Sequence, residues 1–126
     1  MKIGIVGIGL IGASLGWDLR QLGHEVAGVS RQQATCEIAQ REGICDRASC
    51  DLASLKDAEL ILICTPIAAI IPTIEQLVLH LQPETIITDA GSVKGAIVDR
   101  ATQLWPNFVG GHPMAGNSQS GITAFE

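Results

Sequence analysis

The stretch IGIVGIGLIGASL, residues 3–15, decides the fold. It begins with branched apolar residues typical of a buried strand, continues with glycines at positions 7, 9 and 12 in the pattern G-x-G-x-x-G, and ends as the start of a helix. In a dinucleotide-binding unit the first glycine allows a tight turn, the second lets a pyrophosphate approach the backbone, and the third lets helix and strand pack closely. Free N–H groups at the helix start favour the pyrophosphate charge. We therefore predict a dinucleotide site at this turn.

The rest of the chain continues this alternation of strands and helices. Apolar runs predict strands at residues 2–6, 25–29, 60–64, 85–89 and 107–111. Helical spacing and end signals predict helices at residues 10–22, 33–42, 68–81 and 93–104, the third bent or restarted near Pro72, and a short helix that Asp51 caps and that reaches Lys56. Such alternation produces right-handed crossovers between parallel strands. The predicted fold class is α/β, a doubly wound parallel sheet of the Rossmann type.

Length and charge limit the possible functions. The chain has 126 residues, enough for one domain, and a net charge of −5 with no basic block, which argues against a nucleic-acid partner. No apolar run reaches the roughly 20 residues that a membrane span needs, and no cleavage site follows the apolar N-terminus. The sequence therefore predicts a cytoplasmic protein with no membrane partner. After Gly116 the pattern weakens, which predicts a single domain, residues 1–126, cut short at its C-terminal end.

The four cysteines, Cys36, Cys45, Cys50 and Cys64, include no C-x-x-C pair, and no histidine lies at metal-ligand spacing from them. This pattern predicts no metal site. Reduced, mostly buried thiols are the expected state of cysteines in a cytoplasmic protein.

The segment GVSRQQ, residues 28–33, bears on which dinucleotide is bound. An Asp or Glu at this place usually binds the ribose hydroxyls and would repel a 2′-phosphate. Ser30 and Arg31 stand there instead, and a guanidinium can bind a phosphate through two hydrogen bonds and stack on adenine. We predict NADP rather than NAD; the alternative is a solvated surface arginine. The predicted cofactor-binding residues of these two segments are Gly7, Gly9, Leu10, Ile11, Gly12, Ser30, Arg31, Gln32 and Thr35.

Further candidates follow later strands, because ligands of open α/β sheets bind beyond the carboxyl ends of the strands. Cys64, Thr65 and Pro66 follow one strand, Ser92 comes shortly after the next, and His112 lies at the end of the last. We predict that Cys64, Thr65 and Pro66 belong to the cofactor site. His112 is the strongest catalytic candidate, because a neutral imidazole can take a proton from a hydroxyl while hydride leaves its carbon. The alternative is a structural loop histidine. Ser92 can orient His112 or the substrate hydroxyl, or cap the following helix, and both roles can coexist.

Five segments together resemble one enzyme family. These are GIVGIGLIGASL, GVSRQ, LICTP, TDAGSVK and GGHPMAG, and they are similar to the prephenate/arogenate dehydrogenases of tyrosine biosynthesis, in particular to cyanobacterial arogenate dehydrogenases that favour NADP. The last two segments are far more specific than the glycine loop. The resemblance implies oxidative decarboxylation of a cyclohexadienol, either arogenate to tyrosine or prephenate to 4-hydroxyphenylpyruvate, with NADP as the cofactor. The segments do not choose between these two substrates.

The resemblance also implies roles for single residues. His112 would hydrogen-bond the ring hydroxyl and draw off its proton, Ser92 would help to place that hydroxyl beside the nicotinamide, and Thr65 and Pro66 would line the cofactor crevice. Members of the family continue into a helical domain that forms a homodimer and supplies cationic groups for the substrate carboxylates. We expect this chain to lack that domain and therefore to be an NADP-binding domain that alone is incomplete for turnover.

Two other functions are compatible with the sequence. One is a related NADP-dependent reductase or β-hydroxyacid dehydrogenase with a similar N-terminal unit, which the segment GGHPMAG suits less well. The other is a non-catalytic nucleotide-sensing module, in which His112 and Ser92 would be dispensable.

Overall fold

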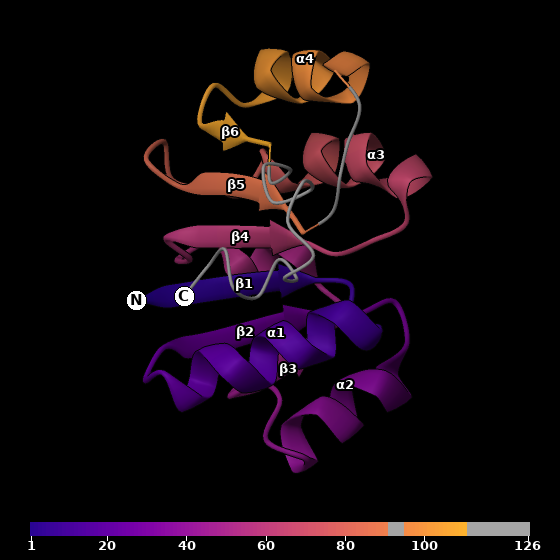
Figure 1. Cartoon of the computed structure of the whole chain (residues 1–126), viewed down its shortest axis with the longest axis vertical. Helices are drawn as coiled ribbons and strands as arrows, with labels where there is room; N and C mark the ends of the chain where they lie inside the picture. Colours follow the sequence, from indigo (N-terminus) through magenta and orange to yellow (C-terminus); the bar gives the residue numbers. More distant parts are fainter. Residues whose placement is uncertain (91–94, 111–126) are drawn as a thin grey trace, which may run out of the picture.

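The protein folds as a parallel sheet covered by helices on both faces (Figure 1). The computed structural model describes residues 1–90 and 95–110. In this part of the chain six strands pair in the order β3-β2-β1-β4-β5-β6, and every pair is parallel. The strands are β1 (Lys2–Val6), β2 (Glu25–Val29), β3 (Arg47–Ser49), β4 (Leu60–Ile63), β5 (Ile86–Asp89) and β6 (Phe108–Val109). The predicted fold class, a doubly wound sheet of the Rossmann type, is confirmed.

Four α-helices and one 3-10 helix connect the strands of the described part. They are α1 (Leu10–Gln21), α2 (Gln33–Arg41), the 3-10 helix η1 (Leu52–Leu55), α3 (Ile67–Leu77) and α4 (Gly95–Leu104). The chain order moves outward from β1 to β3 and then returns to β4 on the other side of β1. The direction of winding therefore reverses between β1 and β4, which is where ligands of such sheets bind. None of the described helices is long and apolar enough to cross a membrane.

The core consists of two hydrophobic clusters, one on each face of the sheet. Leu15 and Leu19 of α1 pack with Leu62 of β4 in one cluster. Ile61 and Ile63, the neighbours of Leu62 along the same strand, belong to the other cluster, which the side chains of α3 and α4 complete. Successive side chains of a strand point to opposite faces, and both faces of this sheet are covered. This explains why β4 is apolar at every position.

The predicted elements agree with the structure apart from three differences. Strand β3 was not predicted, because its three residues include two polar ones and lie at the sheet edge. Helix α3 runs through Pro72 without restarting, and it ends at Leu77 rather than at residue 81. The last predicted strand, 107–111, is only two residues long in the described part. The expected cap is confirmed, since the Asp51 carboxylate accepts the Ala53 N–H at 2.9 Å.

Candidate functional site

The turn between β1 and α1 is held tightly against both neighbouring strands. The Gly7 N–H donates to the Val29 carbonyl of β2 at 2.9 Å. Gly7 has a φ of +96°, and a Cβ there would lie 2.9 Å from the Cys64 carbonyl oxygen at the end of β4. Only glycine combines this left-handed backbone with so close an approach to a neighbouring backbone. The turn therefore fixes where α1 begins relative to β2 and β4.

The other two glycines of the turn have opposite surroundings. A Cβ at Gly12 would overlap the Gly7 carbonyl oxygen, so α1 packs directly on the turn. A Cβ at Gly9 would meet no atom of the described residues within 4 Å. Gly9 is also the N-cap of α1 and makes no side-chain cap, and the first turn of α1 contains no acidic residue. The first N–H groups of the helix and its positive dipole end are thus available to an anion beside Gly9.

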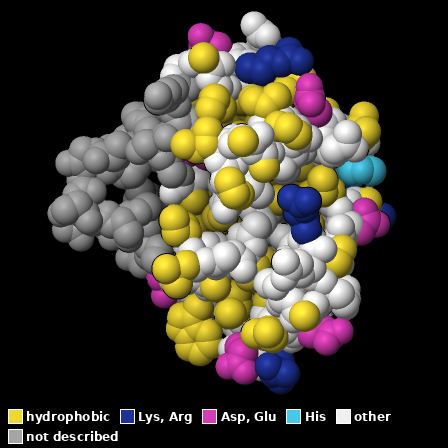
Figure 2. All heavy atoms as spheres, turned by 90° about the vertical axis from the view of Figure 1, so that its right-hand side faces the viewer, with side chains coloured by type: hydrophobic (Ala, Val, Ile, Leu, Met, Phe, Trp, Pro, Cys, Tyr) yellow, Lys and Arg dark blue, Asp and Glu magenta, His cyan; other side chains and the backbone are white. Residues whose placement is uncertain are grey.

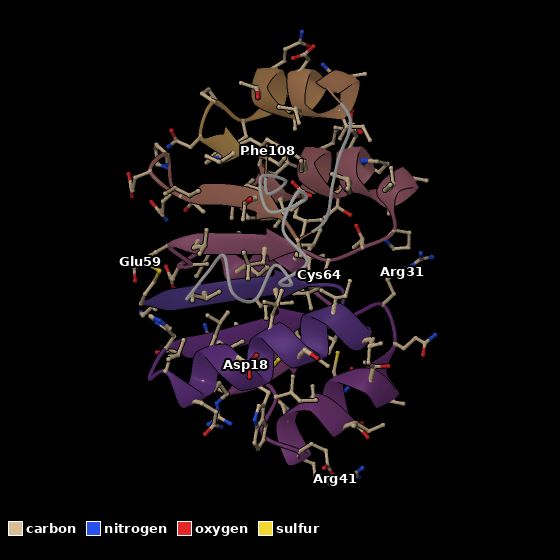
Figure 3. All side chains as sticks on the ribbon, viewed as in Figure 1. Asp18, Arg31, Arg41, Glu59, Cys64 and Phe108 are labelled. Atoms are coloured by element: carbon tan, nitrogen blue, oxygen red, sulfur yellow. The ribbon has the colours of Figure 1, made fainter. Side chains whose placement is uncertain are left out.

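A cavity of about 610 Å³ lies where the winding reverses. Its wall comes from the carboxyl ends of β1, β2 and β4, from the segment after β3 and from α3. In Figure 3, Cys64 lies at the end of β4, and Arg31 lies beyond the ends of the strands. The described lining residues are Val6, Gly7, Ile8, Gly9, Val29, Ser30, Arg31, Gln32, Thr35, Cys50, Leu52, Cys64, Thr65, Pro66, Ala69, Pro72, Thr73 and Gln76.

The charge of this wall is positive. Arg31 is its one charged residue among those described, and no Asp or Glu belongs to the described lining. Each of the other four arginines pairs with a carboxylate within 3.6 Å, whereas Arg31 has no ion pair among the described residues. Figure 2 faces this edge and shows a Lys or Arg side chain among hydrophobic and uncharged groups near the middle, with acidic groups toward the periphery. A local positive group is what an anionic ligand needs on an acidic protein.

The backbone around Arg31 is fixed by hydrogen bonds on both sides. The Ser30 N–H donates to the Ser49 carbonyl of β3 at 3.1 Å, and the Ser30 Oγ accepts the Gln32 N–H at 3.2 Å. Gln32 is in turn the N-cap of α2. Because Ser30 Oγ accepts this bond, its own hydroxyl proton remains available to a ligand.

The end of β4 contributes an unpaired hydroxyl and a neutral thiol. Thr65 Oγ1 is buried and has no hydrogen-bond partner among the residues that the structure describes. Burial, together with the negative charge of Asp89, raises the pKa of the Cys64 thiol to about 12. The thiol is therefore protonated at neutral pH and is neither a nucleophile nor a good metal ligand. Within the described residues no group of three or more His, Cys, Asp or Glu side chains could hold a metal ion.

These features agree with what is known of similar proteins. The chain matches the family model described as prephenate dehydrogenase, nucleotide-binding domain, over residues 15–126. The chain belongs to the prephenate dehydrogenase family. It is therefore the nucleotide-binding domain of a dehydrogenase family, as its turn and cavity indicate.

Individual members of the prephenate dehydrogenase family align with most of the chain. The prephenate dehydrogenase of Lactococcus lactis is 36% identical over 98% of this chain and 36% of its own length. The structure of Synechocystis arogenate dehydrogenase is 55% identical with a TM-score of 0.85, covering 87% of this chain and 40% of that one. Prephenate dehydrogenase from Aquifex aeolicus, in complex with hydroxyphenyl propionate and NAD+, is 29% identical with a TM-score of 0.84, covering 98% and 45%. The chain spans about a third of the length of its curated relatives.

Most of the residues that the sequence predicts for the cofactor site of this chain lie on the cavity wall. These are Gly7, Gly9, Ser30, Arg31, Gln32, Thr35, Cys64, Thr65 and Pro66. Three others are not on the wall: Leu10 and Ile11 are exposed at the start of α1, and Gly12 packs against Gly7. The predicted role of Leu10 and Ile11 rests on the N–H groups at the helix start, and that of Gly12 on the close packing of helix and strand. Ser92 and His112 lie outside the described residues, so their predicted roles stay predictions.

Two parts of the wall were not predicted from the sequence. Cys50 and Leu52 follow β3, the strand that was not predicted. The second part is the α3 face that carries Ala69, Thr73 and Gln76, because the apolar spacing of α3 indicated only core packing. The apolar spacing does identify the buried face of α3. The residues that lie between the buried ones form a second face of the helix, and this face could have been recognised as a candidate for the cavity wall.

Proposed function

We propose that this chain binds NADP as the cofactor domain of a cytoplasmic dehydrogenase that oxidatively decarboxylates a cyclohexadienol. The observation that carries the cofactor assignment is Arg31 on the cavity wall without a carboxylate partner among the described residues. A carboxylate at this place would repel a 2′-phosphate, and the described wall contains none. The hydroxyls of Ser30 and Thr35 are further donors on the same wall.

The residues present fit such a cofactor. The space beside Gly9 and the uncapped start of α1 suit a pyrophosphate, because helix N–H groups and the helix dipole favour an anion there. The unpaired Thr65 hydroxyl, at the end of β4, can serve a polar group of the nicotinamide half. The complex of the similar Aquifex aeolicus enzyme with NAD+ supports a dinucleotide as the ligand of this chain. Arg31 is the reason for assigning NADP to this chain.

Replacing Arg31 by alanine tests this assignment. Charge-assisted hydrogen bonds contribute roughly 1.5–3 kcal/mol each, so we expect Arg31→Ala to weaken NADP binding about 10- to 150-fold. Its NAD affinity should hardly change, because NAD lacks the phosphate. Calorimetric titration of the chain with each cofactor measures both. Arg41→Ala is the control, since Arg41 lies at the other end of α2, pairs with Glu42 and is absent from the cavity wall. Equal losses for the two cofactors would contradict the assignment.

In the proposed reaction His112 and Ser92 act on the substrate hydroxyl. A bound NADP would supply the hydride acceptor for the ring carbon that carries the hydroxyl. His112 takes the hydroxyl proton, and Ser92 holds that hydroxyl in place. The ring carboxylate leaves as CO2, and aromatisation of the ring provides driving force. The chain spans about a third of its relatives, so we assign binding of the substrate carboxylates, and the contact of a homodimer, to the remainder of a full-length protein.

Arogenate is the substrate favoured here, because the identity to the Synechocystis arogenate dehydrogenase is 55%. The test is an assay of the full-length protein with arogenate and with prephenate, each with NADP and with NAD. We expect NADP reduction to be fastest with arogenate. Turnover of small 3-hydroxy acids with neither cyclohexadienol accepted would instead favour a β-hydroxyacid dehydrogenase.

A further inference from the structure

Two cysteines lie near Arg31: Cys50 is on the same cavity wall, and Cys36 binds the carbonyl of Ser30, the residue before Arg31. Cys36, in α2, is fully buried, and its thiol donates to the Ser30 carbonyl at 3.9 Å. Cys50, directly after β3, is exposed and belongs to the cavity wall. Its thiol lies 3.6 Å from Gln33 Oε1. One thiol is thus below the wall and the other is on it.

The backbone brings these two cysteines together. The Ser30 N–H binds the carbonyl of Ser49, the residue before Cys50, while the Ser30 carbonyl accepts from the Cys36 thiol. Gln33, which the Cys50 thiol contacts, precedes Cys36 by three residues and so lies on the same face of α2. Burial, and next to it the neighbouring Cys50 thiol, raises the pKa of Cys36.

The other two cysteines have different surroundings. Cys45 is buried, and a Cβ at Gly28 would lie 2.7 Å from its sulfur, so its surroundings are tightly filled. Burial and the charge of Asp46 raise its pKa to about 11. Cys64 is the neutral thiol at the end of β4. Among the described cysteines Cys50 alone is exposed, so a soluble oxidant meets it first.

We propose that Cys36 and Cys50 are a thiol-modification site that forms a reversible disulfide, and that this disulfide lowers the affinity of the cavity for NADP. The second half of this proposal rests on the proposed NADP binding. The oxidant class is a small-molecule disulfide such as oxidised glutathione.

The exchange proceeds in two balanced steps. The Cys50 thiolate attacks one sulfur of the small disulfide; a mixed disulfide forms, the original S–S bond breaks, and one small thiolate leaves. The Cys36 sulfur then attacks the Cys50 sulfur and releases the second small thiolate. Two protein thiols are oxidised, the small disulfide is reduced to two thiols, and the two protons end on these. Excess reduced thiol reverses both steps.

The bond would change the wall next to Arg31. A disulfide brings two sulfurs to about 2.05 Å, closer than any non-bonded contact, so α2 and the segment after β3 must draw together. The Ser30 carbonyl then loses the Cys36 S–H, and Gln33 loses the Cys50 S–H. Both residues flank Arg31 and Gln32. Losing about one neutral hydrogen bond to the ligand through this shift corresponds to a roughly 2- to 10-fold weaker affinity.

The experiment equilibrates the 126-residue chain in glutathione buffers of graded redox ratio. Mass spectrometry of alkylated, digested protein measures the Cys36–Cys50 disulfide, and calorimetry measures NADP affinity at each end of the series. We expect the disulfide to form and NADP affinity to fall about 2- to 10-fold. If the reduced chain binds NADP more tightly, saturating NADP must favour the reduced form by the same factor. The glutathione redox ratio at which half of the chain is oxidised should then shift toward more oxidising buffer. Cys50→Ser should give equal NADP affinity in both buffers, whereas Cys45→Ala should keep the response.

Each result decides one part of the proposal. Absence of a Cys36–Cys50 disulfide throughout the series would overturn the pairing, and so would a glutathione adduct that stays on Cys50. A disulfide that leaves NADP affinity unchanged would overturn the effect on the cavity. Failure of the reduced chain to bind NADP would overturn the proposed function instead, and the disulfide measurement does not depend on it.

Discussion

Replacing Gly9 by alanine should weaken NADP binding by about 100-fold or more, because at least two charge-assisted hydrogen bonds to the pyrophosphate would be lost. The added Cβ would project into the space next to the start of α1, where no atom in the described part of the chain lies within 4 Å of it. Gly9 and the first N–H groups of α1 would hold the pyrophosphate of a bound cofactor in this space. A methyl group there keeps the phosphates away from those donors.

The same substitution should leave the free protein stable. Gly9 has a φ of −90°, which alanine adopts without strain, and its Cβ would meet no neighbour. Compatible glycine-to-alanine changes stabilise proteins by about 0.4–1 kcal/mol through the unfolded chain. We therefore expect thermal unfolding at the same or slightly higher temperature. Calorimetric titration gives the affinity, and a loss below 3-fold would contradict the pyrophosphate position.

Gly12→Ala is the matched contrast to Gly9→Ala. Its Cβ would overlap the Gly7 carbonyl oxygen, which is backbone and cannot rotate away. Helix α1 would have to move off the turn, and the chain should lose stability. The two variants therefore distinguish two roles: at Gly9 the missing side chain leaves space for the ligand, and at Gly12 it allows α1 to pack on the turn. A Gly12→Ala chain as stable as the natural one would show that α1 can shift freely.

Replacing His112 by asparagine in the full-length protein should lower kcat about 100- to 10,000-fold, the usual contribution of a general base. The carboxyl ends of β4, β5 and β6 lie along one edge of the sheet, and His112 follows β6 by three residues in the sequence. Asparagine keeps a hydrogen-bonding side chain of similar reach but cannot take the proton. NADP binding should persist, because the glycine turn and Arg31 are unchanged.

The pH profile distinguishes this role from a structural one. A general base must be neutral, so the natural enzyme should lose activity as pH falls through the histidine pKa, ordinarily about 6.5. The residual activity of His112→Asn should not show this loss of activity at low pH. His80→Asn, an exposed histidine beyond the end of α3, is the control and should behave as the natural protein does. Near-normal turnover of His112→Asn would contradict the catalytic role of His112.

The sequence was most informative where structure is local. Each of the strands predicted from an apolar run is present in the described part, and the helix starts at residues 10 and 33 agree with the structure. Strand β3 was missed because it contains one apolar residue and depends on pairing with β2. Helix α3 continues through Pro72, which lies on its exposed side, where water can satisfy the freed carbonyl.

By itself the sequence determined the turn of glycines, the order of strands and helices, and Arg31 where an acid is usual. These follow from backbone sterics and hydrophobic periodicity, which act over a few residues. Only the tertiary structure decided that Arg31 has no carboxylate partner among the described residues and that α3 closes one wall of the cavity. It alone also shows that Cys36 and Ser49, the residue before Cys50, both bind the backbone of Ser30. The physical reason is that these are contacts between distant segments, which the packing of helices on the sheet creates.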